Sequence, residues 1–155
     1  MDMDEPTKIP LLEDEYLLLE RFYEDFDARV LTIKGWSATI AIAAICVGFY
    51  QSAFLWLFAA GASLAFWFLE ALWKSFQYCH GNRLERIEKA FREDDYTGIQ
   101  PFQIYTSWAK SWESTSIINA FRGWLTAQPH VVTMIIGLAL FTLQHIAGLQ
   151  LVKSQ

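Results

Sequence analysis

The residues whose chemistry stands out border or interrupt long apolar stretches. Lys34 and Glu70 flank a run of 35 residues, 35–69, that contains no Lys, Arg, Asp or Glu. If this run folds back near Gln51, the two side chains reach similar depth on adjacent antiparallel helices. A carboxylate at a membrane edge needs a partner or water. We therefore expect a membrane-edge ion pair, either structural or at the mouth of a pore or gate; alternatively, Glu70 bonds to Lys74 one turn away.

Polar side chains also interrupt the last apolar run, where Gln144 and His145 are adjacent and His130 lies near the start. Polar residues inside a span usually face protein or water. They act in a proton relay, as ligands of a cofactor, or in a hydrogen bond between helices. The chain offers no second ligand at a matching depth, so we expect the hydrogen bond and no cofactor.

Enzyme signatures are absent from the sequence, which has no glycine-rich phosphate loop, HExxH, GxSxG or CxxC. Cys46 and Cys79 are too far apart in sequence to suggest a metal site, and His80 beside Cys79 lacks further ligands. We predict a protein that is not an enzyme, without catalytic, cofactor-binding or metal-binding residues. The net charge of −5 opposes nucleic-acid binding.

The apolar composition predicts an all-α membrane protein with three transmembrane helices, a hairpin plus one. Hydrophobic residues make up 54% of the chain and charged residues only 19%, whereas soluble domains carry about 25% charged residues. A span needs about 20 apolar residues, so the first long run is divided at its most polar point, residues 50–52. We expect spans at 30–50, 53–73 and 129–152.

The basic residues predict the orientation. Eleven Lys and Arg precede the third span and lie before the hairpin or in the segment after it, whereas only Lys153 follows. We expect a multi-pass protein of the inner (plasma) membrane with a cytoplasmic N-terminus. Residues 153–155 would form an external tail, and lipid would surround the spans.

The N-terminal segment predicts a protein-docking helix. We expect a disordered acidic tail at 1–10 and a cytoplasmic helix at 11–34. Residues 1–33 carry a net charge of −7, which an anionic leaflet would repel. Its apolar stripe must therefore contact another copy, a neighbouring helix of the same chain, or a partner on the cytoplasmic side. The stripe follows a heptad pattern through Leu12, Tyr16, Leu19, Tyr23, Phe26, Val30 and Ile33.

The middle segment, 74–128, predicts two further amphipathic helices on the cytoplasmic side. Gly81-Asn82 indicates a break, followed by a helix at 83–93 whose basic residues would meet the acidic N-terminal helix. A loop follows at 94–101. Tryptophans and apolar residues at helical spacing then predict an interfacial helix at 111–127.

Small residues on the first two spans predict close helix packing, within one chain or between chains. Three spans in a short chain leave much apolar surface to share, which favours a homo-oligomer or a larger complex. The expected packing residues are Ser37, Ala41, Ala44 and Gly48 on the first span, with Gly61 and Ala65 on the second.

The layout over residues 11–80, a cytoplasmic helix that leads into a two-span hairpin, resembles small bacterial membrane effectors of anti-phage systems. The resemblance implies an oligomer that damages the inner membrane and involves no shared catalytic residue. We therefore predict a membrane protein that assembles, as an effector or gated pore of such a defence system. The alternatives are an accessory or anchoring subunit of a larger membrane complex, and an immunity or regulatory protein for another membrane protein.

Overall fold

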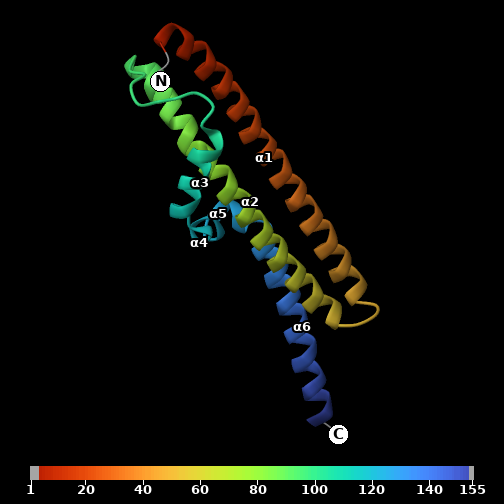
Figure 1. Cartoon of the computed structure of the whole chain (residues 1–155). Coiled ribbons are helices and arrows are strands. Elements are labelled where there is room, and N and C mark those ends of the chain that lie inside the picture. The colour runs from red at the N-terminus through yellow and green to blue at the C-terminus, as the bar shows by residue number, and fades with distance from the viewer. Residues whose placement is uncertain (1–3, 154–155) are drawn as a thin grey trace. The chain divides into compact units, whose positions relative to one another are not determined.

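The computed structural model describes residues 4–153, with side chains up to residue 147. Helices form 85% of the described residues, and these contain no strand. Three helices are long and apolar enough to cross a membrane by length and composition. They are α1 (Glu5–Gly48), α2 (Phe54–Glu93) and α6 (His130–Lys153) (Figure 1). The predicted all-α fold with three candidate spans is thus confirmed at this level.

Helix α1 starts earlier than predicted. Residues 5–10 are helical rather than part of a disordered tail, and Pro10 lies inside the helix. Pro10 has no backbone N–H, so it removes one hydrogen bond of the helix. The loss is close to the N-terminal end, where the first four N–H groups have no partner within the helix. The first turn is supported instead by Asp4, whose carbonyl accepts from the Lys8 N–H at 3.0 Å and whose carboxylate accepts from the Thr7 hydroxyl at 3.2 Å. The predicted residues 1–3 of the tail lie outside the described residues.

Helix α2 contains no break, so the separate helix predicted at 83–93 is wrong. The element continues through Gly81-Asn82 to Glu93, as one ribbon in Figure 1. A helical glycine costs only about 1 kcal/mol relative to alanine. Buried residues on both sides of the dipeptide, Cys79 and Arg83, hold this stretch of helix in place. Local propensity is therefore outweighed by packing.

The predicted interfacial helix at 111–127 is also wrong, because three shorter helices occupy this region: α3 (Ile104–Ser114), α4 (Ile117–Phe121) and α5 (Trp124–Ala127). Thr115 ends α3 with extended backbone, and its hydroxyl donates to the Ser111 carbonyl at 2.7 Å. Gly123 is also extended before α5. Short hydroxyl side chains that bond to nearby backbone compete with helix continuation.

The chain divides into two compact units. Unit 1 comprises the chain up to Arg29 together with Trp73–Ile117. Its core consists of apolar residues from α1, α2 and the loop at 94–103, namely Leu12, Leu19, Ile87, Ala90, Tyr96 and Ile99. The N-terminal heptad stripe thus packs on the same chain, which is one of the three contacts that the sequence allowed.

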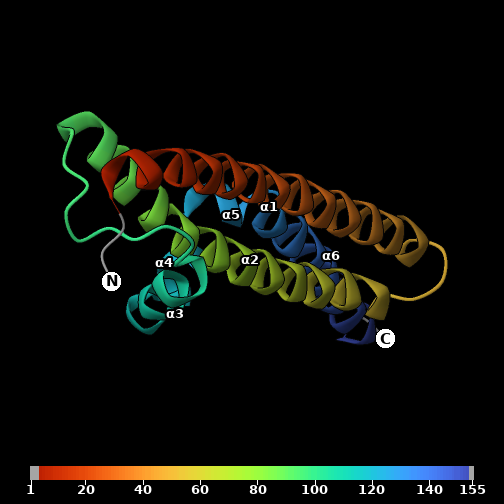
Figure 2. The same cartoon turned by 45° about the horizontal axis from the view of Figure 1, so that its top comes forward.

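Unit 2 comprises Val30–Leu72 and the chain from Ile118 onward. In this unit α1 and α2 form the predicted hairpin through residues 49–53, and α6 lies along α2 (Figure 2). The Trp56 indole N–H closes the hairpin by donating to the Ile45 carbonyl at 3.0 Å. Most large side chains on these helices remain exposed, as expected for surfaces that face lipid or other protein.

Candidate functional site

A buried polar cluster in unit 2 joins all three candidate spans. The Lys34 ammonium lies 3.2 Å from Glu70 Oε1. The other carboxylate oxygen, Oε2, lies 3.0 Å from Nε2 of His130. His130 Nδ1 in turn lies 2.7 Å from the Ser37 hydroxyl. Lys34 and Ser37 come from α1, Glu70 from α2 and His130 from the first turn of α6.

Helix geometry explains why these residues meet. Lys34 and Ser37 are three residues apart and therefore share one face of α1. The hairpin returns α2 to the depth of Lys34 at Glu70. His130 is the first residue of α6, so its ring enters the cluster from the end of the third span. The Lys34 ammonium also donates to the Leu125 carbonyl of α5 at 2.6 Å, which connects the short helix before α6 to the same point.

The cluster compensates charge that would otherwise be costly to bury. Glu70, His130 and Ser37 are almost fully buried, and a lone carboxylate in an apolar interior costs several kcal/mol. With Glu70 ionised, a neutral imidazole satisfies both neighbours: Nε2–H donates to the carboxylate and Nδ1 accepts from Ser37. Glu70 Oε1 accepts no hydrogen bond among the described residues, so its contact with Lys34 is an ion pair.

The structure therefore brings together Lys34 and Glu70, as the spacing around Gln51 suggested. The alternative bond between Glu70 and Lys74 is not formed, because Lys74 donates to Asp27 at 2.6 Å and to Gln77 at 2.8 Å. Sequence reasoning treated His130 separately and missed its place beside Glu70. The sequence did contain a signal for this contact. The predicted third span begins on the side where the first predicted span begins and the second one ends, which places His130 at a depth similar to that of Lys34 and Glu70.

Gln144 and His145 are placed differently from His130. Both side chains are exposed on α6, and neither makes a hydrogen bond to any residue whose side chain the structure describes. His145 stacks on Phe141, with ring centroids 6.3 Å apart and an interplanar angle of 7°. The expected hydrogen bond between helices is thus present at His130 and not at these two residues.

The small residues of the first span face inward more completely than those of the second. Ser37, Ala41 and Gly48 are buried and Ala44 is partly buried. The side chain of Trp56 covers Gly48 so closely that no Cβ would fit.

On the second span, Gly61 and Ala65 are exposed, so of the two possibilities that the sequence left open, packing within this chain does not occur, and packing between chains stays a prediction. The adjacent helix face is used instead. There, the Ser63 hydroxyl lies 2.7 Å from the Thr133 hydroxyl of α6. A Cβ on Gly137 of α6 would lie only 2.6 Å from the Trp56 carbonyl oxygen. The sequence analysis missed Gly137, although a glycine within an apolar span is typical of close helix contact.

Unit 1 contains a second buried ion pair, which the sequence analysis also missed. Arg83 binds both carboxylate oxygens of Glu15, with Nε 2.8 Å from Oε1 and Nη2 3.0 Å from Oε2, and both side chains are buried. Arg83 Nη2 donates to the Gln100 carbonyl at 2.7 Å, and the Phe102 N–H donates to Glu15 at 2.7 Å. The pair therefore fastens the loop at 94–103 to α1 and α2. Its general form, basic residues of 83–93 against the acidic helix, was predicted.

In unit 1, the pKa values of Asp27 and His80 are lower than usual. The hydrogen bond from Lys74 lowers the pKa of the Asp27 carboxyl. Burial lowers the pKa of His80, whose ring lies near Phe22 and Phe26 with centroids 6.2 and 5.7 Å away. The apolar surroundings therefore favour the neutral imidazole.

The two cysteines are both free and belong to different units. Cys46 is exposed, whereas Cys79 is buried with its sulfur 3.3 Å from the Thr115 hydroxyl. No group of three His, Cys, Asp or Glu side chains gathers for a metal ion within residues 4–147.

No protein-family model, curated protein or solved structure matches this chain, so a function must be argued from the residues themselves.

Proposed function

We propose that this chain is a non-enzymatic, multi-pass protein of the inner membrane that assembles with further copies of itself. The observation that carries the proposal is the exposure of Gln144 and His145 on α6. A polar side chain in hydrocarbon is unfavourable, and such residues in spans usually face protein. The amide of Gln144 both donates and accepts, so it is complementary to the same group in a second copy.

The buried cluster around Glu70 serves a different purpose in this proposal. It holds the three spans of one chain together, because it takes one side chain from α2, two from α1 and one from α6. Leu12, Tyr16 and Leu19 of the heptad stripe are likewise packed in the core of unit 1. Neither surface is therefore free for association. The contacts between copies would lie on the exposed faces of α6 and α2, the latter carrying Gly61 and Ala65.

The test is the mass of the intact particle, measured by native mass spectrometry after transfer to nanodiscs. We expect a homo-oligomer for the unchanged protein and a shift to monomer when Gln144→Leu and His145→Leu are combined. Thr142→Val is the matched control. Thr142 is also exposed on α6, but its hydroxyl already donates to the Leu138 and Ala139 carbonyls of its own helix. A monomer from the unchanged protein would overturn the proposal.

The assembly would act as a membrane effector or gated pore of a bacterial, anti-phage type of defence. The spans expose few polar residues, so a gated or membrane-disrupting assembly fits better than a standing aqueous channel. Expression should then arrest growth and depolarise the membrane. A stoichiometric foreign partner would instead favour an accessory subunit, and protection against a membrane toxin would favour an immunity protein.

A further inference from the structure

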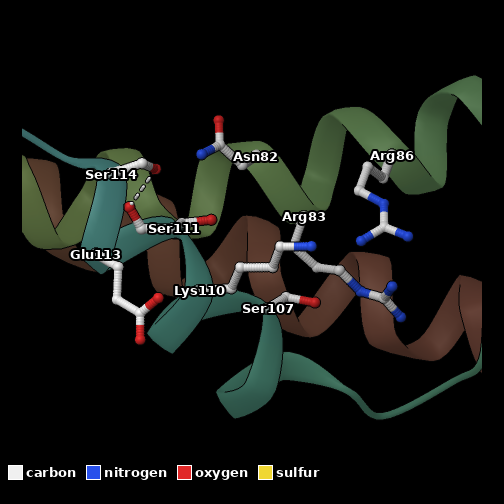
Figure 3. Close-up of a pocket in the computed structure, with 8 residues that line it drawn as sticks. All are labelled: Asn82, Arg83, Arg86, Ser107, Lys110, Ser111, Glu113 and Ser114. Carbon is white, nitrogen blue, oxygen red and sulfur yellow. Dashed lines mark hydrogen bonds between the residues drawn. The ribbon is translucent and has the colours of Figure 1, made fainter.

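Unit 1 contains a polar pocket between α2 and α3 that the proposed assembly does not use. The pocket has a volume of about 510 Å³. Figure 3 shows the side chains that line it, with Arg83 and Arg86 on α2 and Ser107, Lys110 and Ser111 on α3. Lys110 extends from α3 toward Arg83, and the Ser107 hydroxyl points to the same side (Figure 3). Three cationic groups and two hydroxyls therefore surround one space.

The positive charge of this pocket is only partly compensated. Arg83 is already paired with Glu15. Arg86 and Lys110 form no ion pair with any residue in the described part of the chain. Glu113 also lines the pocket, but its carboxylate points away from Lys110 in Figure 3. Two exposed cations thus remain without a counter-charge at the mouth of a cavity, in a chain whose net charge is −5.

We propose that this pocket binds a phosphate monoester of a small organic molecule. The Arg86 guanidinium can bind two phosphate oxygens through parallel N–H donors, and the Lys110 ammonium adds a point charge. The hydroxyls of Ser107 and Ser111 can donate to the remaining oxygens. The volume lies within the range of small-molecule sites, about 300–1,000 Å³, and leaves room for an organic group beside the phosphate.

The position of the pocket along α2 favours a free ligand over a lipid headgroup. Asn82, which also lines the pocket, follows Trp73 by nine residues within one helix. At 1.5 Å per residue this is about 14 Å along the axis. The headgroup layer beyond the apolar core is only about 5–8 Å thick on each side. If the second span ends near Trp73, the pocket lies beyond that layer.

The experiment is calorimetric titration of the full chain in phosphatidylcholine nanodiscs at constant ionic strength. The probe is glycerol 3-phosphate, and glycerol is the control that lacks the phosphate. We expect saturable binding of the first and none of the second. Arg86→Gln and Lys110→Gln should each weaken binding about tenfold, because each removes charge-assisted hydrogen bonds. Arg92→Gln is the matched control, since Arg92 is an exposed cation of α2 that does not line the pocket.

Three results would overturn the proposal. The first is the absence of saturable binding, and the second is equal binding by the unchanged protein and the Lys110→Gln variant. The third is loss of glycerol 3-phosphate binding when phosphatidic acid is mixed into the nanodisc, which would identify a lipid headgroup as the occupant. Arg86 and Lys110 are exposed, so their replacement leaves the core intact, and circular dichroism of each variant checks this. Particle mass is independent of these outcomes, so the assembly proposal is tested separately.

Discussion

Glu70 links side chains of α1 and α6 within unit 2. Its carboxylate is fully buried and has Lys34 on one side and His130 on the other. Removal of one partner from a buried ion pair typically costs about 3–5 kcal/mol, because the remaining charge stays buried without compensation. Removal of both partners avoids that penalty. The two single substitutions should therefore not be additive.

We predict that Glu70→Gln and Lys34→Gln each lower the free energy of unfolding, and that the double substitution lowers it by less than the sum of the two single effects. The coupling energy should reach about 1–3 kcal/mol, measured by denaturant unfolding in detergent micelles. Lys89 and Glu93 provide the control pair, because they are exposed and their charged atoms are 3.9 Å apart. Their coupling should stay near 0.5 kcal/mol or below. Additive effects at Lys34 and Glu70 would show that the two side chains do not stabilise the fold as an ion pair.

At Glu15, the prediction concerns the loop as well as stability. Glu15→Gln leaves the buried Arg83 guanidinium without its counter-charge and should destabilise unit 1 by about 3–5 kcal/mol. It also weakens the acceptor of the Phe102 N–H, so hydrogen exchange should accelerate at Phe102. Glu13→Gln, an exposed change on the same helix, should alter neither quantity. Unchanged exchange at Phe102 would show that the loop is held by other contacts.

The lowered pKa of His80 gives unit 1 a dependence on acidity. Because the unfolded chain has the usual His pKa of 6.5 and the folded chain a lower one, the unfolded state binds the proton first as pH falls. The contribution of His80 is therefore complete above pH 6.5 and declines as pH falls through the folded pKa. Tryptophan fluorescence during urea unfolding, at pH 7 and below, measures this decline. His80→Gln should reduce it.

Among the glycines that the structure describes, Gly137 reveals the closest approach to the backbone of another helix, between α6 and α2. A Cβ on Gly137 would collide with the Trp56 carbonyl oxygen, which belongs to backbone and cannot turn aside. Gly61, on α2, has nothing within 4 Å of the corresponding position. The same substitution at these two glycines therefore separates close packing from helix propensity.

We expect Gly137→Ala to lower the thermal unfolding midpoint in detergent, with a cost of about 1–3 kcal/mol from overpacking. Gly61→Ala should be neutral or stabilise the single chain by up to about 1 kcal/mol, because alanine favours the helix and meets no neighbour within this chain. Equal effects at the two positions would contradict the close approach of α6 to α2.

The elements that the sequence predicted well are those with long apolar runs. The hairpin around Gln51 and the third span, expected at 129–152 and found at His130–Lys153, follow from length and hydropathy alone. The continuity of α2 through Gly81-Asn82 could not be predicted from local residues, since it depends on the burial of Cys79 and Arg83. The ion pair between Lys34 and Glu70 could be predicted, because both residues lie at similar distances in sequence from the turn near Gln51. Glu15 and Arg83 lie 68 residues apart, and no periodicity links them.

At the scale of the whole molecule, the orientation of the chain is the property to test. The excess of Lys and Arg before the third span favours a cytoplasmic N-terminus and an external C-terminus. In a background with Cys46→Ala and Cys79→Ala, Gln155→Cys should react with a membrane-impermeant maleimide in intact cells. Thr7→Cys should react only after the cells are opened. Labelling of position 7 but not 155 in intact cells would reverse the proposed topology.

The long separation between partners in unit 1 has a consequence for synthesis on the ribosome. Leu12 and Ile87 belong to one core but are 75 residues apart. At about 5–20 residues per second, translation takes roughly 4–15 s to bring the second after the first. During that interval the apolar stripe of the nascent acidic helix has no native cover. Ribosome profiling of nascent-chain contacts should therefore find chaperones engaged from the first helix until Ile87 has emerged.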